Sequence, residues 1–167
     1  MNSKERVLSA LNHQNTDQIP IDFGATPVTG IHCLAIENIR KHYGLTPKPI
    51  KIIEPYQMLG EIDAELREIL HIDVIGLSPK KNMFGVVQGN WQEFKTFWGQ
   101  VVLMPGEMKT TLDKDGSLLV YPQGDTQAAA SAKMPASSYF FDALIRQEPI
   151  IEEELKAEDN LEEFGLW

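Results

Sequence analysis

The hydrophobic positions of the first eighty residues alternate between two periods. Apolar residues recur at helical spacing near residues 3–14, 30–43 and 59–70. After each of these segments comes a short apolar run with the length of a buried strand, at residues 19–23, 50–53 and 72–77. Helices that alternate with buried strands predict an α/β fold with parallel strand pairing.

Local signals indicate where these elements begin and end. Asn2 or Ser3 can cap the first helix, because each side chain offers an acceptor to the free amides of the first turn. Gly44 suits the left-handed residue that ends the second helix. Pro20 has no N–H to donate, so the run at 19–23 is predicted to start at this proline or to lie at a sheet edge.

The pattern changes after residue 90. The stretches "FKTFWGQVVLM", "MKTTLDKDGSLLVYP" and "SSYFFD" are rich in aromatic and β-branched residues, and Asp115-Gly116 suits a hairpin turn. We therefore expect three regions: the first β/α units at 1–90, an antiparallel β insertion at 91–142, and an acidic C-terminal helix or tail at 143–167. Within the last region, the helical pattern covers 149–164.

Charge and cysteine content narrow the function classes. The chain of 167 residues has 15 Lys and Arg against 24 Asp and Glu, a net charge of −9, and residues 148–163 alone carry −7 of it as eight acidic residues and one lysine. Such a surface repels phosphate backbones and anionic lipid, which disfavours a role at nucleic acids or membranes. Cys33 is the only cysteine, and neither a signal peptide nor a long apolar run is present, so we expect a cytoplasmic protein.

Two aspartates in apolar runs are candidates for chemistry, because a carboxylate there must be paired, hydrogen-bonded or at a cavity. Asp22 lies near the carboxyl end of its run, where α/β folds bind ligands, whereas Asp73 lies near the start of its run and suits a structural role better. The neighbours His32 and Cys33 point about 100° apart on a helix and rarely chelate one metal. No spacing identifies a catalytic residue, and we expect no metal site within this chain.

Several segments, taken in order, resemble the uroporphyrinogen decarboxylase superfamily, in particular its decarboxylase-like and corrinoid-dependent methyltransferase-like members. They are "KERVLSALNHQNTDQIPIDFG", "TGIHCLAIENIRKHYGL", "GEIDAELREILHIDVIGLSP", "FKTFWGQVV", "DGSLLVYPQGD" and "KMPASSYFFD". The resemblance implies a (β/α)₈ barrel that acts on the acetate groups of a tetrapyrrole or on a methyl group carried by a corrinoid. In the methyltransferase branch, zinc activates a thiol as the bound thiolate.

Departures from the family pattern favour the methyltransferase branch. The stretch "IDFGATPVTG" contains no arginine to hold substrate carboxylates, and Ser78-Pro79-Lys80 stands where the decarboxylases carry an essential aspartate. The zinc ligands of the methyltransferases come from the later half of the barrel. No cofactor site is therefore expected in this chain, and zinc and a corrinoid methyl donor are implied only through the resemblance.

Length points to a partial barrel. A (β/α)₈ barrel takes about 200–250 residues or more, so we expect the front half of such a barrel, which carries the antiparallel insertion and is incomplete as a catalyst alone. A natural truncation, a split gene and an expressed fragment all remain open. Expected partners are a second barrel half or a second copy at the exposed sheet edge, and a corrinoid protein. The alternatives are a non-catalytic binding or assembly module and a uroporphyrinogen decarboxylase-like lyase.

Four residues are the candidates for substrate binding, because they lie at or just after predicted strand ends: Asp22, Gly24, His32 and Gln57. We expect Asp22 to orient the substrate or to accept a hydrogen bond from it.

Overall fold

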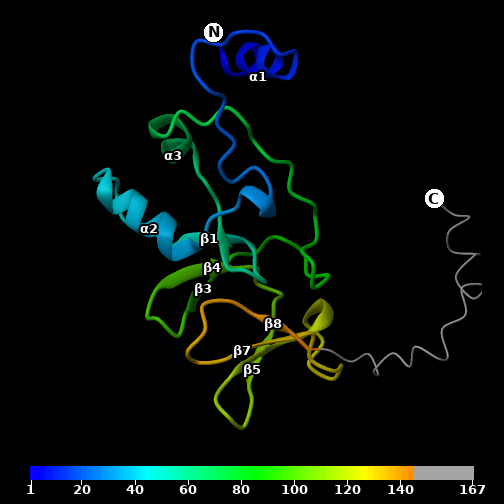
Figure 1. Ribbon diagram of the computed structural model, residues 1–167. Helices are drawn as coiled ribbons and strands as arrows, with labels where there is room; N and C mark the ends of the chain where they lie inside the picture. Colours follow the sequence, from blue (N-terminus) through cyan, green and yellow to red (C-terminus); the bar gives the residue numbers. More distant parts are fainter. Residues whose placement is uncertain (145–167) are drawn as a thin grey trace, which may run out of the picture.

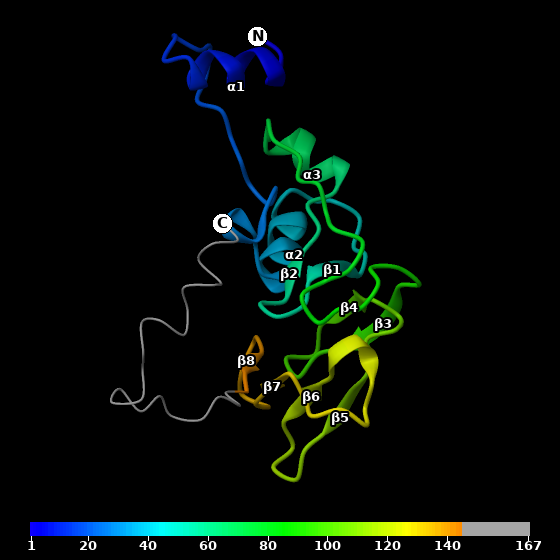
Figure 2. The ribbon, with the colours of Figure 1, turned by 90° about the vertical axis from the view of Figure 1, so that its right-hand side faces the viewer.

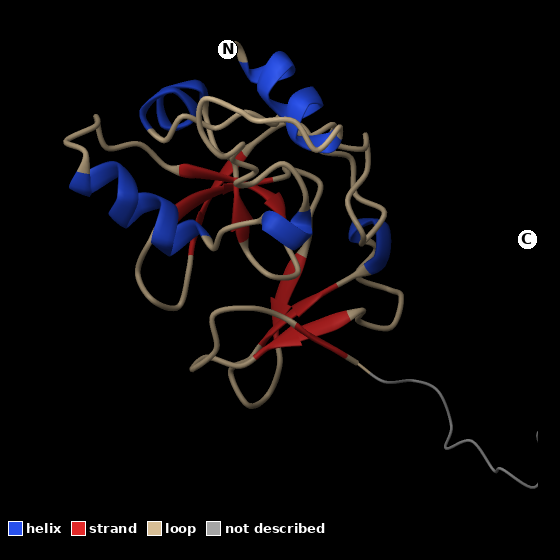
Figure 3. Ribbon diagram, turned by 45° about the horizontal axis from the view of Figure 1, so that its top comes forward, coloured by secondary structure: helices blue, strands red, loops and turns tan. Residues whose placement is uncertain are grey.

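The computed structural model describes residues 1–144, which form a mixed α/β structure (Figure 1). In this part of the chain, three α-helices and two short 3₁₀ segments are combined with eight strands in two four-stranded sheets. Figures 1 and 2 show α2 (Cys33–His42) and α3 (Ala64–Ile69) beside the first sheet, α1 (Ser3–Leu11) apart from it at one end of the molecule, and the second sheet toward the opposite end. The predicted α/β class is confirmed (Figure 3), whereas residues 1–144 form no closed barrel.

The first two helices form as their local signals predict. Helix α1 (Ser3–Leu11) begins with a capping box, in which the Asn2 side chain accepts from the Glu5 N–H at 2.9 Å and the Glu5 carboxylate accepts from the Asn2 N–H at 3.0 Å. Helix α2 (Cys33–His42) starts later than the hydrophobic pattern indicates, at the N-cap His32. It ends just before Gly44, which has the expected left-handed φ of +64°.

The third helix is shorter than predicted. Helix α3 spans Ala64–Ile69, and Asp63 caps it by accepting from the Leu66 N–H at 3.0 Å. The prediction of a helix from residue 59 is wrong, because β2 (Leu59–Gly60) pairs there with a neighbouring strand. A side chain at Gly60 would overlap Ile50, so this close strand packing, rather than the helical spacing, decides the conformation.

The first sheet has the strand order β2-β1-β4-β3. Strand β1 (Ile50–Glu54) pairs in parallel with β4 (Val101–Met104), with Ile50 opposite Val102. Strands β2 and β3 (Gln92–Lys95) add to the two sides in antiparallel orientation. The strand predicted at 50–53 is therefore confirmed, and its parallel partner comes from the region predicted as an insertion.

The second sheet is antiparallel, with the order β5-β6-β7-β8. Its strands are β5 (Thr110–Leu112), β6 (Leu118–Val120), β7 (Ala132–Met134) and β8 (Asp142–Ala143). The predicted hairpin turn at Asp115-Gly116 is confirmed: Gly116 has φ +80°, and the Asp113 N–H donates to the Ser117 carbonyl at 2.8 Å. The predicted boundaries between the three regions remain a prediction.

The two apolar runs at 19–23 and 72–77 are not strands, and the prediction of strands there is wrong. They lie side by side, but the Ile21 N–H donates to the Asp73 side chain instead of a backbone carbonyl. Several of their apolar side chains are also exposed: Ile19 is 83%, Ile75 68% and Leu77 100% exposed. Without a ladder of backbone hydrogen bonds, the segments remain extended but irregular.

One apolar core connects the two sheets. It runs from Ile36 on α2 and Ile52 on β1 through Val102 on β4 to Val120 and Met134 in the second sheet, and each of these side chains is at most 2% exposed. Burial of this continuous apolar surface holds the two sheets together. Helix α1 lies apart from this core at one end of the molecule (Figure 2).

The described residues bear only partly on membrane-spanning helices and on the predicted acidic C-terminal helix. Among residues 1–144, no helix has both the length and the apolar character needed to cross a membrane. The acidic helix predicted at 149–164 lies outside the described residues.

Candidate ligand-binding site

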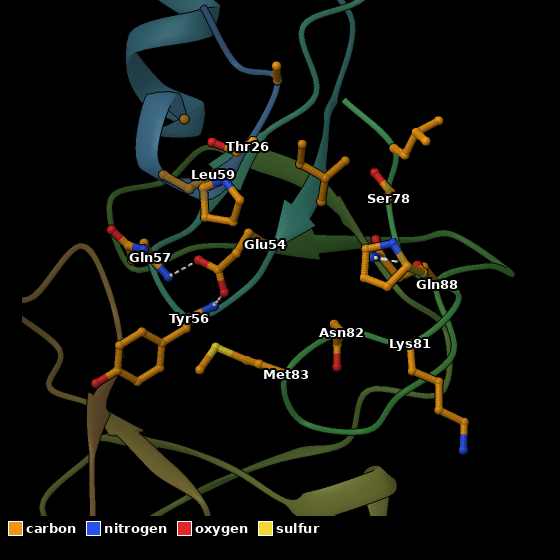
Figure 4. A pocket seen from close by; sticks show the side chains of 16 residues that line it. Thr26, Glu54, Tyr56, Gln57, Leu59, Ser78, Lys81, Asn82, Met83 and Gln88 are labelled. Atoms are coloured by element: carbon orange, nitrogen blue, oxygen red, sulfur yellow. Dashed lines mark hydrogen bonds between the residues drawn. The ribbon is translucent and has the colours of Figure 1, made fainter. Parts of the chain in front are cut away.

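A cavity of about 670 Å³ lies where three segments reach their carboxyl ends (Figure 4). Residues 25–27 form one wall, the end of β1 with Tyr56 and Gln57 forms the second, and residues 77–79 form the third. Residues 81–83 close the remaining side. We call this the first cavity. Ligands of α/β folds bind outside the carboxyl ends of the strands, so its position makes it the candidate site.

Two of the three segments run parallel. The Asp73 N–H donates to the Ile21 carbonyl at 2.9 Å, and further along, a Cβ on Gly76 would overlap the Ala25 carbonyl oxygen. The contacts advance in the same direction along both segments, so their carboxyl ends reach the same edge. Gly76 is needed because only a residue without a side chain allows this close backbone approach.

The turn after β1 shapes the second wall. The Glu54 carboxylate accepts from the Tyr56 N–H and from the Gln57 N–H, both at 2.9 Å, as the dashed lines in Figure 4 show. Met58, fully buried, closes the turn with φ +55°, a conformation that costs a residue with a side chain about 1 kcal/mol or more. The surrounding contacts hold this turn, so Tyr56 and Gln57 are presented to the cavity by a fixed backbone.

Asn82 lies in the wall of the first cavity and has a buried side-chain amide. Its side chain is 8% exposed, and its Oδ1 accepts from the backbone N–H groups of Phe84 at 3.0 Å and Val86 at 3.1 Å. These two donors fix the orientation of the amide, because the opposite orientation would turn the amide N–H₂ toward them. Nδ2 is buried and has no partner. An unpaired buried donor costs about 1–3 kcal/mol, and because Nδ2 is enclosed, Asn82 shapes the wall of the cavity rather than presenting this donor to a ligand.

Asp22 and Gly24 shape the walls but do not line the first cavity. The Asp22 carboxylate accepts from the Ala25 N–H at 3.3 Å and from the Thr29 hydroxyl at 3.0 Å, so it stabilises the loop that forms the first wall. Gly24 has φ +90°, and a side chain there would overlap Ile62. It lines a smaller space of about 110 Å³ beside the first cavity.

His32 and Gln57 meet at a second pocket of about 570 Å³, which also includes Tyr139. The His32 Nδ1 accepts from the Leu34 N–H at 3.2 Å, so the ring proton is on Nε2 and is donated to the Tyr139 carbonyl at 2.9 Å. Gln57 is exposed and lines both spaces, so it is the predicted residue that links them. The structure therefore brings two of the four predicted residues together.

Zinc does not fit the side chains of this region. Burial raises the pKa of the Cys33 thiol to about 12, and the thiol donates to the Gln100 side chain at 3.3 Å. Both ring nitrogens of His32 are already hydrogen-bonded. Within residues 1–144, no three His, Cys, Asp or Glu side chains lie close enough together to hold a metal ion.

Sequence reasoning missed Glu54, Tyr56 and Asn82. The signal for Glu54 was present, since a carboxylate directly after the apolar run at 50–53 and before a proline marks the end of a strand. Asn82 gave no such signal, because its place beside the cavity depends on chain segments that are distant in sequence.

Comparisons with known proteins found no matching family model, no matching curated protein and no matching solved structure.

Proposed function

We propose that this chain is the amino-terminal, substrate-binding part of a uroporphyrinogen decarboxylase-like protein of the corrinoid-dependent methyltransferase type, which transfers a methyl group to a thiol. The observation that carries the proposal is the first cavity at the carboxyl ends of three segments, the place where (β/α)₈ barrels bind their substrates. The parallel segments ending at 25 and 76 would then be adjacent strand positions in the front half of such a barrel. The same proposal places the protein in the cytoplasm, in keeping with its single cysteine.

In this proposal the chain binds and orients the substrate. Gln57 offers an exposed amide at the entrance, and the buried amide of Asn82 fixes the wall beside it through its hydrogen bonds to Phe84 and Val86. Each Glu54 oxygen accepts one backbone N–H and keeps acceptor capacity for a substrate donor. Because zinc does not fit residues 1–144, activation of the thiol is assigned to groups from outside them, and the described part of the chain is incomplete as a catalyst.

The charge of the site favours methyl transfer over the lyase alternative. A tetrapyrrole with several carboxylates needs several cations, but Lys81 is the one cationic side chain among the residues that line the first cavity. The described arginines are engaged elsewhere: Arg6 pairs with Asp17 and Asp73, Arg40 pairs with Asp63 and Glu65, and Arg67 donates to the Ile62 carbonyl.

A second candidate is a binding module or split-enzyme subunit that completes a barrel with another chain. The observation that favours it is the exposure of Ile19, Ile75 and Leu77 along the two parallel segments, where a barrel would continue. This candidate shares the first cavity with the main proposal. A binding module would support no chemistry, whereas a split-enzyme subunit would support it only together with the other chain.

Binding can be tested by NMR on the side-chain amide signals of Gln57 and Asn82. Titration with 2-mercaptoethanol and with its S-methyl product should shift both signals, and the two compounds should compete. Gln57→Leu should abolish the shift of the Asn82 signal, since it removes the exposed amide at the entrance of the cavity. Lys81→Gln is the control at another residue that lines the cavity and should retain binding. Absence of shifts with both compounds would overturn the proposed substrate site, and shifts with uroporphyrin instead would favour the lyase.

Turnover is tested separately. The purified chain, supplied with methylcobalamin, zinc and the same thiol, should give no methylated thiol by mass spectrometry. Turnover by the chain alone would overturn its proposed incompleteness. Turnover that begins only when a second chain is added would favour methyl transfer over the binding module, and binding without turnover in every such mixture would favour the module.

A further inference from the structure

The second pocket is lined largely by aromatic rings, and we call it the aromatic pocket. Its lining includes Tyr56, Tyr139, Phe140 and the imidazole of His32, together with Asp142. The side chains of Tyr139 and Phe140 are each 49% exposed, so their rings are accessible to a small molecule. The volume of about 570 Å³ is within the range of small-molecule sites, about 300–1,000 Å³.

Two of the rings that line this pocket, those of Tyr56 and Tyr139, are held in place by contacts outside it. The Tyr139 ring packs on Trp98 with centroids 5.3 Å apart, and its carbonyl accepts from His32. The Tyr56 hydroxyl accepts from the Ala143 N–H at 2.9 Å. The Tyr56 and Tyr139 side chains are therefore preorganised, and a ligand would lose little free energy to ordering these two.

Asp142 gives the pocket a negative charge that none of residues 1–144 neutralises. Asp142 is exposed, and its carboxylate forms no hydrogen bond or ion pair with any of residues 1–144. Lys133, which lies opposite Asp142 in the sheet, is instead paired with Asp113 at 3.0 Å and with Asp115 at 2.8 Å. None of the residues that line the pocket is a lysine or arginine.

We infer that the aromatic pocket binds a quaternary ammonium group. Aromatic faces attract a cation through their quadrupoles, and methylated ammonium suits them because it is weakly hydrated and fills apolar space. Asp142 adds a charge of opposite sign at the edge of the pocket. A neutral aromatic ligand would also contact the rings but would gain nothing from the carboxylate, whereas a metal ion would need more oxygen ligands than Asp142 supplies.

This inference does not depend on the proposed methyl transfer. It rests on the aromatic pocket alone, whereas the methyl-transfer proposal rests on the first cavity. The two spaces share the lining residues Tyr56, Gln57 and Leu59 and are therefore adjacent. If 2-mercaptoethanol does not bind, the expectation of choline binding still stands. If choline does not bind, the methyl-transfer proposal still stands.

Isothermal titration calorimetry with choline tests the inference. The neutral isostere 3,3-dimethylbutan-1-ol has the same shape without the charge. We expect choline to bind with a dissociation constant on the order of 1 mM, since it has few atoms, and the isostere to bind roughly 3- to 30-fold more weakly, as loss of the cation–π attraction predicts. Equal affinities, or no choline binding at 20-fold above the expected dissociation constant, would overturn the inference.

Variants locate the site. Tyr139→Leu and Phe140→Leu each should weaken choline binding roughly 3-fold or more. Asp142→Asn should weaken it as well, and Asp142→Glu should retain most of it. Leu77→Ser is the control, because Leu77 lines the first cavity and not the aromatic pocket. Tyr139 packs against Trp98, so the Phe140 and Asp142 variants decide the result if Tyr139→Leu unfolds. Unchanged choline affinity in both Phe140→Leu and Asp142→Asn would overturn the assignment of choline to the aromatic pocket.

Discussion

The guanidinium of Arg6 donates a hydrogen bond to the carboxylate of Asp73, 67 positions further along the chain. Arg6 also donates to Asp17 at 2.7 Å, and Asp17 accepts from the amino terminus at 2.8 Å. The Asp73 side chain is 1% exposed, and its other oxygen accepts from the Ile21 N–H. This network links α1 to the two parallel segments, and it holds α1 in a position where the helix adds little to the apolar core.

Replacement of Asp73 by Ala should release α1. The variant removes the acceptor of both Arg6 and the Ile21 N–H, so amide exchange in α1 should become faster by roughly tenfold or more, the usual effect of losing a charged hydrogen bond. Hydrogen exchange followed by NMR measures this. Glu68→Ala is the control, since Glu68 is exposed on α3 and has no ion pair among the described residues. Equal exchange in α1 of the variant and the unmodified protein would show that the network does not hold the helix.

The same network should respond to acid. The hydrogen bond from Arg6, with help from the amino terminus, holds the pKa of Asp17 well below its usual range. Burial opposes ionisation of Asp73, but donors from Ile21, Ser3 and Arg6 outweigh it and lower the pKa of this carboxyl too. Both carboxylates are ionised in the folded protein at pH values where the unfolded chain begins to bind protons, near pH 4.

Their stabilisation is therefore complete above about pH 4 and is lost as the pH falls through the lower folded-state pKa values. Protection of the α1 amides should be constant between pH 5 and 7 and should decrease below about pH 3. The Asp17→Asn variant should show a smaller acid response. A loss of protection that already begins between pH 5 and 7 would contradict this explanation.

A methyl group at Gly76 should separate the two parallel segments. Gly76→Ala places a Cβ against the Ala25 carbonyl oxygen, and the strain should lower the free energy of unfolding by about 1–3 kcal/mol. The first wall of the first cavity would move with residue 25, so ligand shifts at Asn82 should also weaken. Urea unfolding and the NMR titration measure the two effects.

Gly89→Ala is the matched control for this substitution. A Cβ at Gly89 meets nothing within 4 Å, so stability should stay unchanged or rise by about 0.4–1 kcal/mol. Equal destabilisation by both substitutions would mean that close packing at Gly76 is not the cause.

Gln100 should be essential for the contact between α2 and the β3–β4 hairpin. Its buried side chain accepts from the Trp98 indole at 2.9 Å and from the Cys33 thiol, and it donates to the Cys33 carbonyl at 3.1 Å. Gln100→Leu leaves these groups without partners and should lower the free energy of unfolding by about 2–3 kcal/mol. Urea unfolding measures this change. Gln92→Leu, at an exposed position on β3, should cost much less.

The Cys33 thiol gives an independent measure of that contact. With its pKa raised to about 12 by burial, the thiol should react with Ellman's reagent at pH 8 at a small fraction of its rate in urea. Gln100→Leu should increase the rate in the folded state, because loosening α2 exposes the sulfur. Fast reaction in the unmodified protein would contradict the burial of Cys33.

Elements defined by neighbouring residues could be predicted from sequence. The N-cap at Asn2, the left-handed stop at Gly44 and the turn at Gly116 need only local backbone geometry, and each is present. Strand β1 was equally clear, since the run at 50–53 is apolar and buried. In these cases the residues that make the signal also make the contacts.

Features that depend on distant residues could not be predicted. The run at 19–23 has the composition of a strand, but the Asp73 side chain takes the N–H that would start its ladder. Leu59 fits a helical stripe, yet Gly60 lets it pair beside β1 instead. The same holds for the predicted site residues. Gln57 lines both the first cavity and the aromatic pocket, as a site residue should. The Asp22 carboxylate instead faces its own loop, because Ala25 and Thr29 offer hydrogen-bond donors there.

The sequence alone therefore determined the α/β class, the N-cap of the first helix, the hairpin turn at Gly116 and the net negative charge, because each follows from local conformation or composition. Only the tertiary structure decided that Glu54, Gln57 and Asn82 surround one cavity and that Asp142 lies beside aromatic rings. The reason is physical: burial and hydrogen bonding between residues many positions apart outweigh local preferences of about 1 kcal/mol, and no local pattern records which distant partners will meet.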